Sequence, residues 1–217
     1  MTARGLFITV EGGEGVGKST NMAYLEKELA GHGVDLLVTR EPGGSALGER
    51  VRQLLLAVDA EAIDPMAELL LVFAARAQHI STLIEPALAA GKWVLCDRFT
   101  DATYAYQCGG RGLDRGAVSS LEQLVQGELR PDCTLLLDAP VATGMARAQG
   151  RGELDRFERE ELAFFERVRA TYLELAESSS GRYCIIDARQ RLETVQQQLL
   201  KVCNELTACW GVRHPEP

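Results

Sequence analysis

The stretch EGGEGVGKST occupies Glu11–Thr20 and directly follows the apolar run LFITV. Within it, Gly12, Gly17, Lys18 and Ser19 have the spacing G-x-x-x-x-G-K-[ST], which is typical of loops that wrap around phosphate groups. Glycines allow positive φ angles and carry no Cβ, so the backbone amides of such a loop can converge on an anion. A plain glycine-rich turn is the alternative, but it does not account for the lysine. The stretch therefore predicts a triphosphate-binding loop between a strand and a helix.

The binding of a triphosphate with Mg²⁺ predicts roles for two residues of this loop and for one residue outside it. We expect Lys18 to contact the β- and γ-phosphates and the Ser19 hydroxyl to hold Mg²⁺. Asp97 ends the apolar run WVLCD, where its carboxylate can hold Mg²⁺ directly or through water. An aspartate in that place is also often a helix cap, and both interpretations stay open. The residues expected to bind the phosphates are Gly12, Gly13, Glu14, Gly15, Val16, Gly17, Lys18, Ser19 and Thr20.

Outward from the loop, short apolar runs alternate with longer stretches of helical periodicity. This alternation predicts an α/β fold with a five-stranded parallel sheet and helices on both faces. Asp64 and Pro65 open a helical stretch to residue 90, as a core helix or a helix pair. The expected strands lie at 6–10, 35–40, 93–97, 133–138 and 183–187.

Composition narrows the class of protein. The 217 residues are expected to form a single domain, 1–217. A net charge of -8 argues against a broad nucleic-acid-binding face, so no nucleic-acid partner is expected. Six cysteines without a C-x-x-C pair, and no secretory leader, predict reduced thiols and a cytoplasmic protein. No run reaches the roughly 18 apolar residues of a membrane span, so no membrane contact is expected.

Thr103, Tyr106 and Gln107 share one face of a predicted helix because they are three and four residues apart. A hydroxyl, a phenol and an amide on one face can read a base edge and a sugar, although such a trio can also be a polar surface stripe. The run CTLLLDAP ends without the N-K-x-D that a small GTPase needs. The missing motif argues against a small GTPase, and the trio alone leaves both interpretations open.

Six motifs in order make the sequence resemble the bacterial thymidylate kinases, which transfer the γ-phosphoryl of ATP to dTMP. The resemblance covers roughly residues 6–206 and implies a P-loop nucleoside monophosphate kinase-like fold. It also implies ATP and dTMP as substrates, Mg²⁺ as cofactor, a role in dTTP biosynthesis and a homodimer formed through helices such as those in 51–90. The motifs are EGGEGVGKST, TREPGG, FAARAQH, CDRFTDATYAYQCGGRG, RGELDRFE and IDA.

The resemblance assigns a set of residues to dTMP. Arg98 and Arg52 match arginines that hold its 5′-phosphate, for which a planar guanidinium is well suited. Arg76 matches the arginine that donates to thymine O4, and Tyr106 matches a tyrosine under the deoxyribose. Glu14 matches an acidic residue that accepts from the 3′-hydroxyl. The full set is Glu14, Glu41, Pro42, Arg52, Val72, Phe73, Arg76, Arg98, Thr103, Tyr106 and Gln107.

One departure from the family concerns the residue that stacks on thymine. Relatives often have phenylalanine four residues before the arginine, where this sequence has Val72, and the phenylalanine is Phe73. Both positions lie on the helical side of Arg76. Phe73 can reach the ring by a small rotation or belong to the core, and both alternatives stay open.

The segment at about 149–160 is predicted to be a mobile lid that supplies positive charge. Some relatives have an arginine in the phosphate loop, where this chain has Glu14. The resemblance places the basic residues in the lid instead, at Arg147, Arg151 and Arg156, with Arg151 as the first choice. Each can alternatively form an ion pair with a neighbouring acidic residue. The predicted catalytic set is Lys18, Asp97, Arg98 and Arg151.

The motif IDA marks the predicted adenine side. Asp187, Ala188 and Arg189 match a loop whose backbone holds the base, and Arg189 either stacks on adenine or is a surface arginine. Three competing functions remain: another nucleoside or nucleotide monophosphate kinase of the same fold, a binding module in which ATP acts as a switch, and a structural interaction protein, which leaves Lys18 and Asp97 unexplained.

Overall fold

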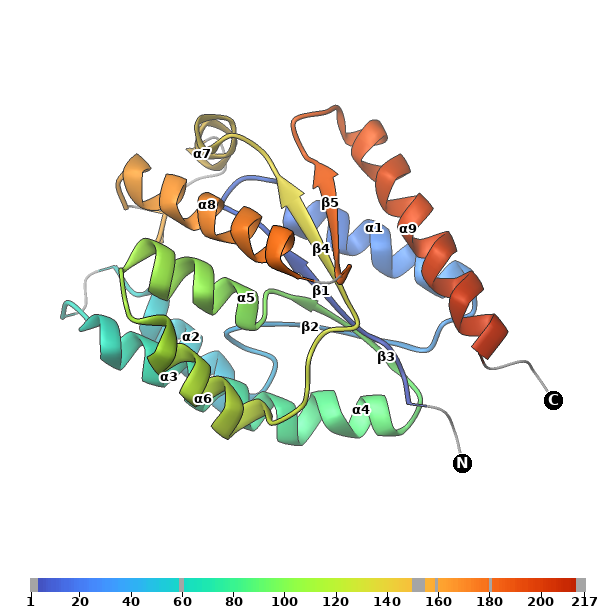
Figure 1. Ribbon diagram of the computed structural model, residues 1–217, viewed down its shortest axis with the longest axis horizontal. Coiled ribbons are helices and arrows are strands. Elements are labelled where there is room, and N and C mark those ends of the chain that lie inside the picture. Colours follow the sequence, from blue (N-terminus) through green and yellow to red (C-terminus); the bar gives the residue numbers. More distant parts are fainter. Residues whose placement is uncertain (1–3, 59–60, 150–154, 159, 180, 214–217) are drawn as a thin grey trace.

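The computed structural model describes residues 4–58, 61–149, 155–158, 160–179 and 181–213. Its described strands form one parallel five-stranded sheet in the order β2-β3-β1-β4-β5 (Figure 1). The predicted α/β class is confirmed, and three strand ranges agree to the residue. The strands are β1 (Phe7–Glu11), β2 (Leu36–Arg40), β3 (Trp93–Asp97), β4 (Cys133–Asp138) and β5 (Tyr183–Asp187).

Helices connect consecutive strands, and their starts follow from local chemistry. Ser45 accepts from the Gly48 amide, Asp64 accepts from the Met66 and Ala67 amides, and Asp114 accepts from the Ala117 amide; each is an N-cap. The helical elements are α1 (Lys18–Gly31), α2 (Ala46–Leu56), α3 (Pro65–His79), η1 (Ile80–Ile84), α4 (Glu85–Ala89), α5 (Thr100–Thr103), η2 (Tyr104–Gly110), α6 (Arg115–Gln126), α7 (Val141–Gln149), α8 (Leu162–Ser178) and α9 (Leu192–Arg213).

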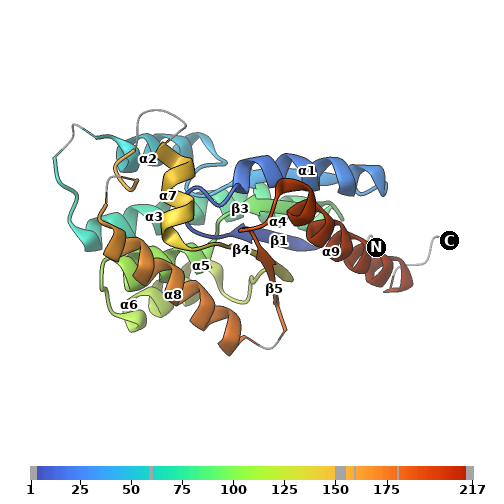
Figure 2. The same ribbon diagram turned by 90° about the horizontal axis from the view of Figure 1, so that it is seen from above.

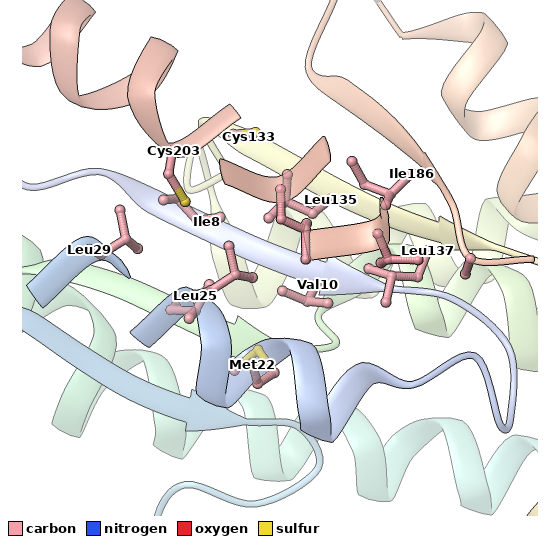
Figure 3. Packing of buried hydrophobic residues seen from close by; sticks show 14 of the residues in the cluster. Ile8, Val10, Met22, Leu25, Leu29, Cys133, Leu135, Leu137, Ile186 and Cys203 are labelled. Atoms are coloured by element: carbon pink, nitrogen blue, oxygen red, sulfur yellow. The ribbon is translucent and has the colours of Figure 1, made fainter. Parts of the chain in front are cut away.

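The core has two layers because alternate residues of each strand point to opposite faces of the sheet. Ile8 and Val10 in β1 point toward α1 and α9, which lie side by side (Figure 2). Figure 3 shows side chains of these two helices, such as Leu25 and Cys203, packed on β1 and β4. On the other face Phe7 packs against η1, α4 and Phe99. Burial on both faces explains the continuous apolar runs in the sequence.

The helical stretch after Asp64 is one run, Pro65–Ala89, in which α3 passes through the π-helical turn η1 into α4. By length and hydropathy it could span a membrane, but half of its most apolar window is buried within the protein. It also carries the buried residues Glu68, Arg76 and His79. These features identify it as a core helix, which is one of the two predicted alternatives.

Candidate active site

The loop between β1 and α1 has the backbone that its glycines predict. Gly12, Gly15 and Gly17 have φ angles of 140°, 68° and 91°, a region in which residues with a Cβ are strained. A Cβ on Gly15 would lie 1.8 Å from the carbonyl oxygen of Gly144 in α7. The loop can therefore pass this close to α7 only without a side chain at that position.

Lys18 is folded back over the loop. Its Nζ donates to the carbonyl oxygens of Gly12 and Gly13 at 3.2 and 2.8 Å. Burial, followed by the nearby charge of Arg98, lowers the pKa of the Lys18 ammonium. An anion placed here offsets both effects, since it compensates the burial and the neighbouring cation.

Asp97 and Arg98 lie beside the loop because β3 is paired with β1, with Val10 opposite Asp97. In the described part of the chain the buried Asp97 Oδ1 has no hydrogen-bond partner. Such an oxygen is costly unless a cation or water satisfies it. Asp97 together with the Ser19 hydroxyl therefore fits a hydrated Mg²⁺ that also contacts phosphate. Among the described residues, no cluster of three or more His, Cys, Asp or Glu could hold a metal alone.

Arg98 connects the phosphate loop to the rest of the cleft. Its φ of 68° is rare for a residue other than glycine. NH1 donates to the Gly12 carbonyl at 3.0 Å and to the Tyr172 hydroxyl at 3.1 Å. NH2 donates to Glu14 Oε1 at 2.6 Å and to the Tyr106 hydroxyl at 2.9 Å. Five contacts of this kind, including 4.7 Å to the Tyr106 ring, fix the guanidinium in one orientation.

Glu11, the last residue of β1, supports this arrangement and was not singled out from the sequence. Its buried carboxylate accepts from the Phe99 amide at 2.7 Å and from the Tyr172 hydroxyl at 2.8 Å. Burial, followed by the nearby Asp101 carboxylate, raises the pKa of Glu11 to about 8. Glu11 thereby fixes Tyr172 and the backbone just after Arg98.

A cleft of about 240 Å³ extends from the loop toward α3. Most residues predicted for the two nucleotides lie on it, so the fold brings together motifs far apart in the sequence. Those on its walls are Glu14, Gly15, Gly17, Lys18, Ser19, Glu41, Pro42, Arg52, Val72, Arg76, Asp97, Arg98, Thr103, Tyr106 and Gln107. The walls also contain Asp155, Phe157 and Glu158, which belong to the predicted lid segment, and five residues that we did not predict, namely Arg40, Leu55, Leu56, Phe99 and Ala102.

Arg76 lies at the far end of the cleft with 1% of its surface exposed. Its Nε donates to Glu41 Oε2 at 2.7 Å, and its NH2 donates to Thr103 Oγ1 at 2.9 Å. The guanidinium also stacks 4.8 Å from the Phe73 ring and 5.0 Å from the Phe99 ring. No described residue pairs with the buried NH1 group. This end of the cleft thus offers one unused, fixed and charged donor.

The predicted turn at Glu41 and Pro42 contains a cis peptide bond and is held from two sides. Glu41 Oε1 contacts His79 Nδ1 at 2.9 Å, and the other ring nitrogen of His79 contacts Thr39 Oγ1 at 2.7 Å. Arg52 NH1 donates to the Pro42 carbonyl at 3.2 Å. Burial, followed by nearby Arg40, lowers the pKa of Arg52. Arg52 and Arg40 are thus two cations that an anion in the cleft would stabilise.

Val72 and Phe73 occupy different environments. Val72 lines the cleft, whereas Phe73 is buried among Leu69, Cys108 and Val118 and does not line it. Of the two alternatives for Phe73, the structure shows the core position. Sequence alone leaves the choice open because one residue of helical rotation decides it.

Of the three predicted lid arginines, Arg147 and Arg156 lie in the described part of the chain, and they contact different elements. Arg147 donates to the Ala188 carbonyl at 3.0 Å. Arg156 donates from Nε to the Leu55 carbonyl at 2.7 Å and from NH2 to Glu68. Arg151 lies outside the described residues. Gln107, on η2, also donates to Glu68.

The predicted adenine loop follows β5. Ala188 N donates to the Asp138 carbonyl at 2.9 Å, which connects this loop to the end of β4. Arg189 forms two hydrogen bonds of 2.8 Å with Asp187, so it pairs with its neighbour here. Those bonds, with Gln190, lower the pKa of Asp187. The loop is not among the residues that line the cleft.

Comparison with known proteins gives one consistent result. The family model for thymidylate kinase matches residues 10–199. A thymidylate kinase of Pseudomonas syringae pv. tomato is 59% identical over 202 residues, which cover 93% of this chain and 96% of the relative. The thymidylate kinase of Teredinibacter turnerae is 58% identical in sequence, over 92% of this chain and 96% of that relative. The chain is also similar to the crystal structure of the Ehrlichia chaffeensis thymidylate kinase, with 32% sequence identity and a TM-score of 0.75. The match covers 92% of this chain and 98% of that one.

Proposed function

The chain belongs to the thymidylate kinase family and phosphorylates dTMP with ATP as donor, and from this premise we propose that both nucleotides lie end to end in the cleft described above. The unused NH1 group of Arg76 is the observation that carries the proposal. Thymine presents an acceptor, O4, to such a donor, whereas cytosine presents an amine there. The buried arginine therefore favours thymine over cytosine.

The ATP phosphates bind in the loop between β1 and α1. Main-chain amides and the N-terminus of α1 surround them, and Lys18 exchanges its contacts with Gly12 and Gly13 for phosphate oxygens. Ser19 and Asp97 would hold Mg²⁺, as the buried and unpaired Asp97 Oδ1 supports. When bound, Mg²⁺ neutralises charge on the β- and γ-phosphates. The adenine lies toward Asp187, Ala188 and Arg189.

The acceptor phosphate of dTMP binds at Arg98 and Arg52, with Arg40 nearby. One of its oxygens attacks the γ-phosphorus in line, the bond from that phosphorus to the β–γ bridging oxygen breaks, and ADP leaves. No general base is needed because the acceptor phosphate is already an anion at neutral pH. The contribution of the protein is orientation and positive charge, to which Arg151 contributes on the sequence prediction.

We also propose that the chain acts as one domain and forms a homodimer in the cytoplasm. Apolar side chains are exposed on α2, α3 and α6, which pack side by side: Leu54 is 48%, Leu70 51% and Leu124 81% exposed. Exposed apolar side chains on neighbouring helices suit an isologous contact. The six free cysteines suit a reducing compartment. Light scattering should give twice the chain mass of 23.7 kDa.

A coupled ADP-release assay with ATP and Mg²⁺ tests the cleft assignment. We expect turnover with dTMP to exceed turnover with dCMP and dGMP, and Asp97→Asn to raise the Mg²⁺ concentration needed for half-maximal rate. Equal use of dCMP would contradict the role given to Arg76. ATP binding without transfer to any monophosphate would favour the switch alternative.

A further inference from the structure

Glu68 has no place in the mechanism above, yet its carboxylate is a point where four parts of the chain meet. It lies on α3, is 0% exposed and is not among the residues that line the cleft. It accepts from Gln107 Nε2 of η2 at 2.8 Å, from Arg111 at 3.4 Å and from Arg156 NH2. Arg156 in turn donates to the Leu55 carbonyl of α2. A buried carboxylate with three donors is strongly tied to its partners.

The first consequence concerns the turn at residues 155–158. Asp155 and Phe157 of this turn line the cleft. Arg156 fastens the turn to Glu68, and Phe157 packs edge-on against Tyr106 with ring centroids 5.9 Å apart. The contact with α3 is therefore one of those that hold the turn in place as a wall of the cleft.

The second consequence concerns the amide of Gln107, which lines the cleft and is buried. An ionised carboxylate only accepts hydrogen bonds, so Glu68 selects the Gln107 orientation in which Nε2 faces it. The group that remains for a bound base is then the acceptor oxygen Oε1. Thymine carries a donor, N3–H, next to its acceptor O4, whereas N3 of cytosine is an acceptor. Beside the donor NH1 of Arg76, an acceptor at Gln107 is complementary to thymine.

We propose that Glu68 is a positioning residue that fastens the turn 155–158 onto the cleft and fixes Gln107 for thymine. It acts through Arg156 and Gln107 and touches neither nucleotide. This inference rests on the proposed placement of dTMP in the cleft. Because Glu68 contacts both Gln107 and Arg156, one carboxylate contributes to base selection and also holds the turn 155–158 against the part of the cleft where dTMP is proposed to bind.

The direct test replaces Glu68 by glutamine, which keeps the shape and removes the charge. A neutral amide also lets the Gln107 amide rotate, so Nε2 can face the base. We expect KM for dTMP to rise about tenfold, the preference for dTMP over dCMP to fall, and KM for ATP to stay the same. Unchanged dTMP affinity and base preference in the folded variant would overturn the proposal.

Because Glu68→Gln leaves two arginines without their full charge partner, it is paired with a milder variant. Arg156→Gln alters a partly buried residue and leaves Glu68 with Arg111 and Gln107. Faster amide hydrogen exchange at residues 155–158, without substrate and with unchanged exchange in the sheet, is the expected result for both variants. The matched control Arg115→Gln breaks the exposed ion pair with Glu174 and should change neither exchange nor kinetics. Exchange at 155–158 equal to that of the parent protein would refute the fastening role, even if the placement of dTMP were itself wrong.

Discussion

Replacing Arg76 by lysine separates the charge of this residue from its planar donor array. Lysine can keep the ion pair with Glu41, whose partner atoms are 2.7 Å apart. It cannot at the same time donate to Thr103 and to a base, because its ammonium is a single point and the guanidinium is a fork. The two arginine groups lost are NH2, bound to Thr103 at 2.9 Å, and the unused NH1.

The magnitude follows from the kind of contact that is lost. A hydrogen bond from a charged donor contributes about 1.5–3 kcal/mol, which corresponds to about 10- to 150-fold in dTMP affinity. Loss of the contact with Thr103, which also has a charged donor, costs about 1.5–3 kcal/mol of stability, less than the roughly 5–15 kcal/mol of a typical domain, so the variant should remain folded.

The assay is calorimetric titration with dTMP, supported by KM values for dTMP and ATP. We expect weaker dTMP binding and unchanged ATP binding in Arg76→Lys. Arg115→Lys, on the exposed pair with Glu174, is the matched control and should bind like the parent protein. If Arg76→Lys binds dTMP as tightly as the parent, NH1 does not contact the base and the orientation of dTMP must be different.

Three further variants test other parts of the account. Glu11 has a raised pKa of about 8 against an ordinary 4.5, so the unfolded chain releases a proton that the folded protein keeps; stability should fall as pH rises between these values. In Glu11→Gln, the free energy of unfolding measured with urea should differ less between pH 5 and pH 8 than in the parent protein. An unchanged difference would contradict the raised pKa of Glu11. Gly15→Ala should weaken ATP binding in fluorescence titration because its Cβ meets the Gly144 carbonyl, whereas Gly33→Ala, also at positive φ but in open space, should not. Arg151→Ala should lower kcat on the order of a thousandfold with little change in dTMP affinity, and an unchanged kcat would refute its role.

Features that depend on neighbouring residues or on a regular spacing could be predicted from the sequence. The glycines of the loop, the apolar runs of the strands and the Asp64 cap all act within a few residues, and the structure has them where they were predicted. Parallel pairing then places Asp97 beside the loop without further information.

Other features depend on contacts between distant residues, for which the sequence carries no periodic signal. Glu68 meets Arg156 across 88 residues and Gln107 across 39, and nothing around Glu68 marks it as a meeting point. Glu11 is a similar case, because its role depends on Tyr172, 161 residues away. Phe99 and Arg40 were missed although each adjoins a predicted residue, since side-chain direction decides which neighbour faces the cleft.

A crystal structure with TMP and a non-hydrolysable ATP analogue tests the central claim most directly. The account predicts the triphosphate in the loop around Lys18, the TMP phosphate at Arg98 and Arg52, and thymine O4 on Arg76 NH1. The acceptor oxygen and the γ-phosphorus should then lie about 3–3.5 Å apart. Density for TMP elsewhere, with the pocket at Thr103 and Gln107 empty or closed, would contradict it.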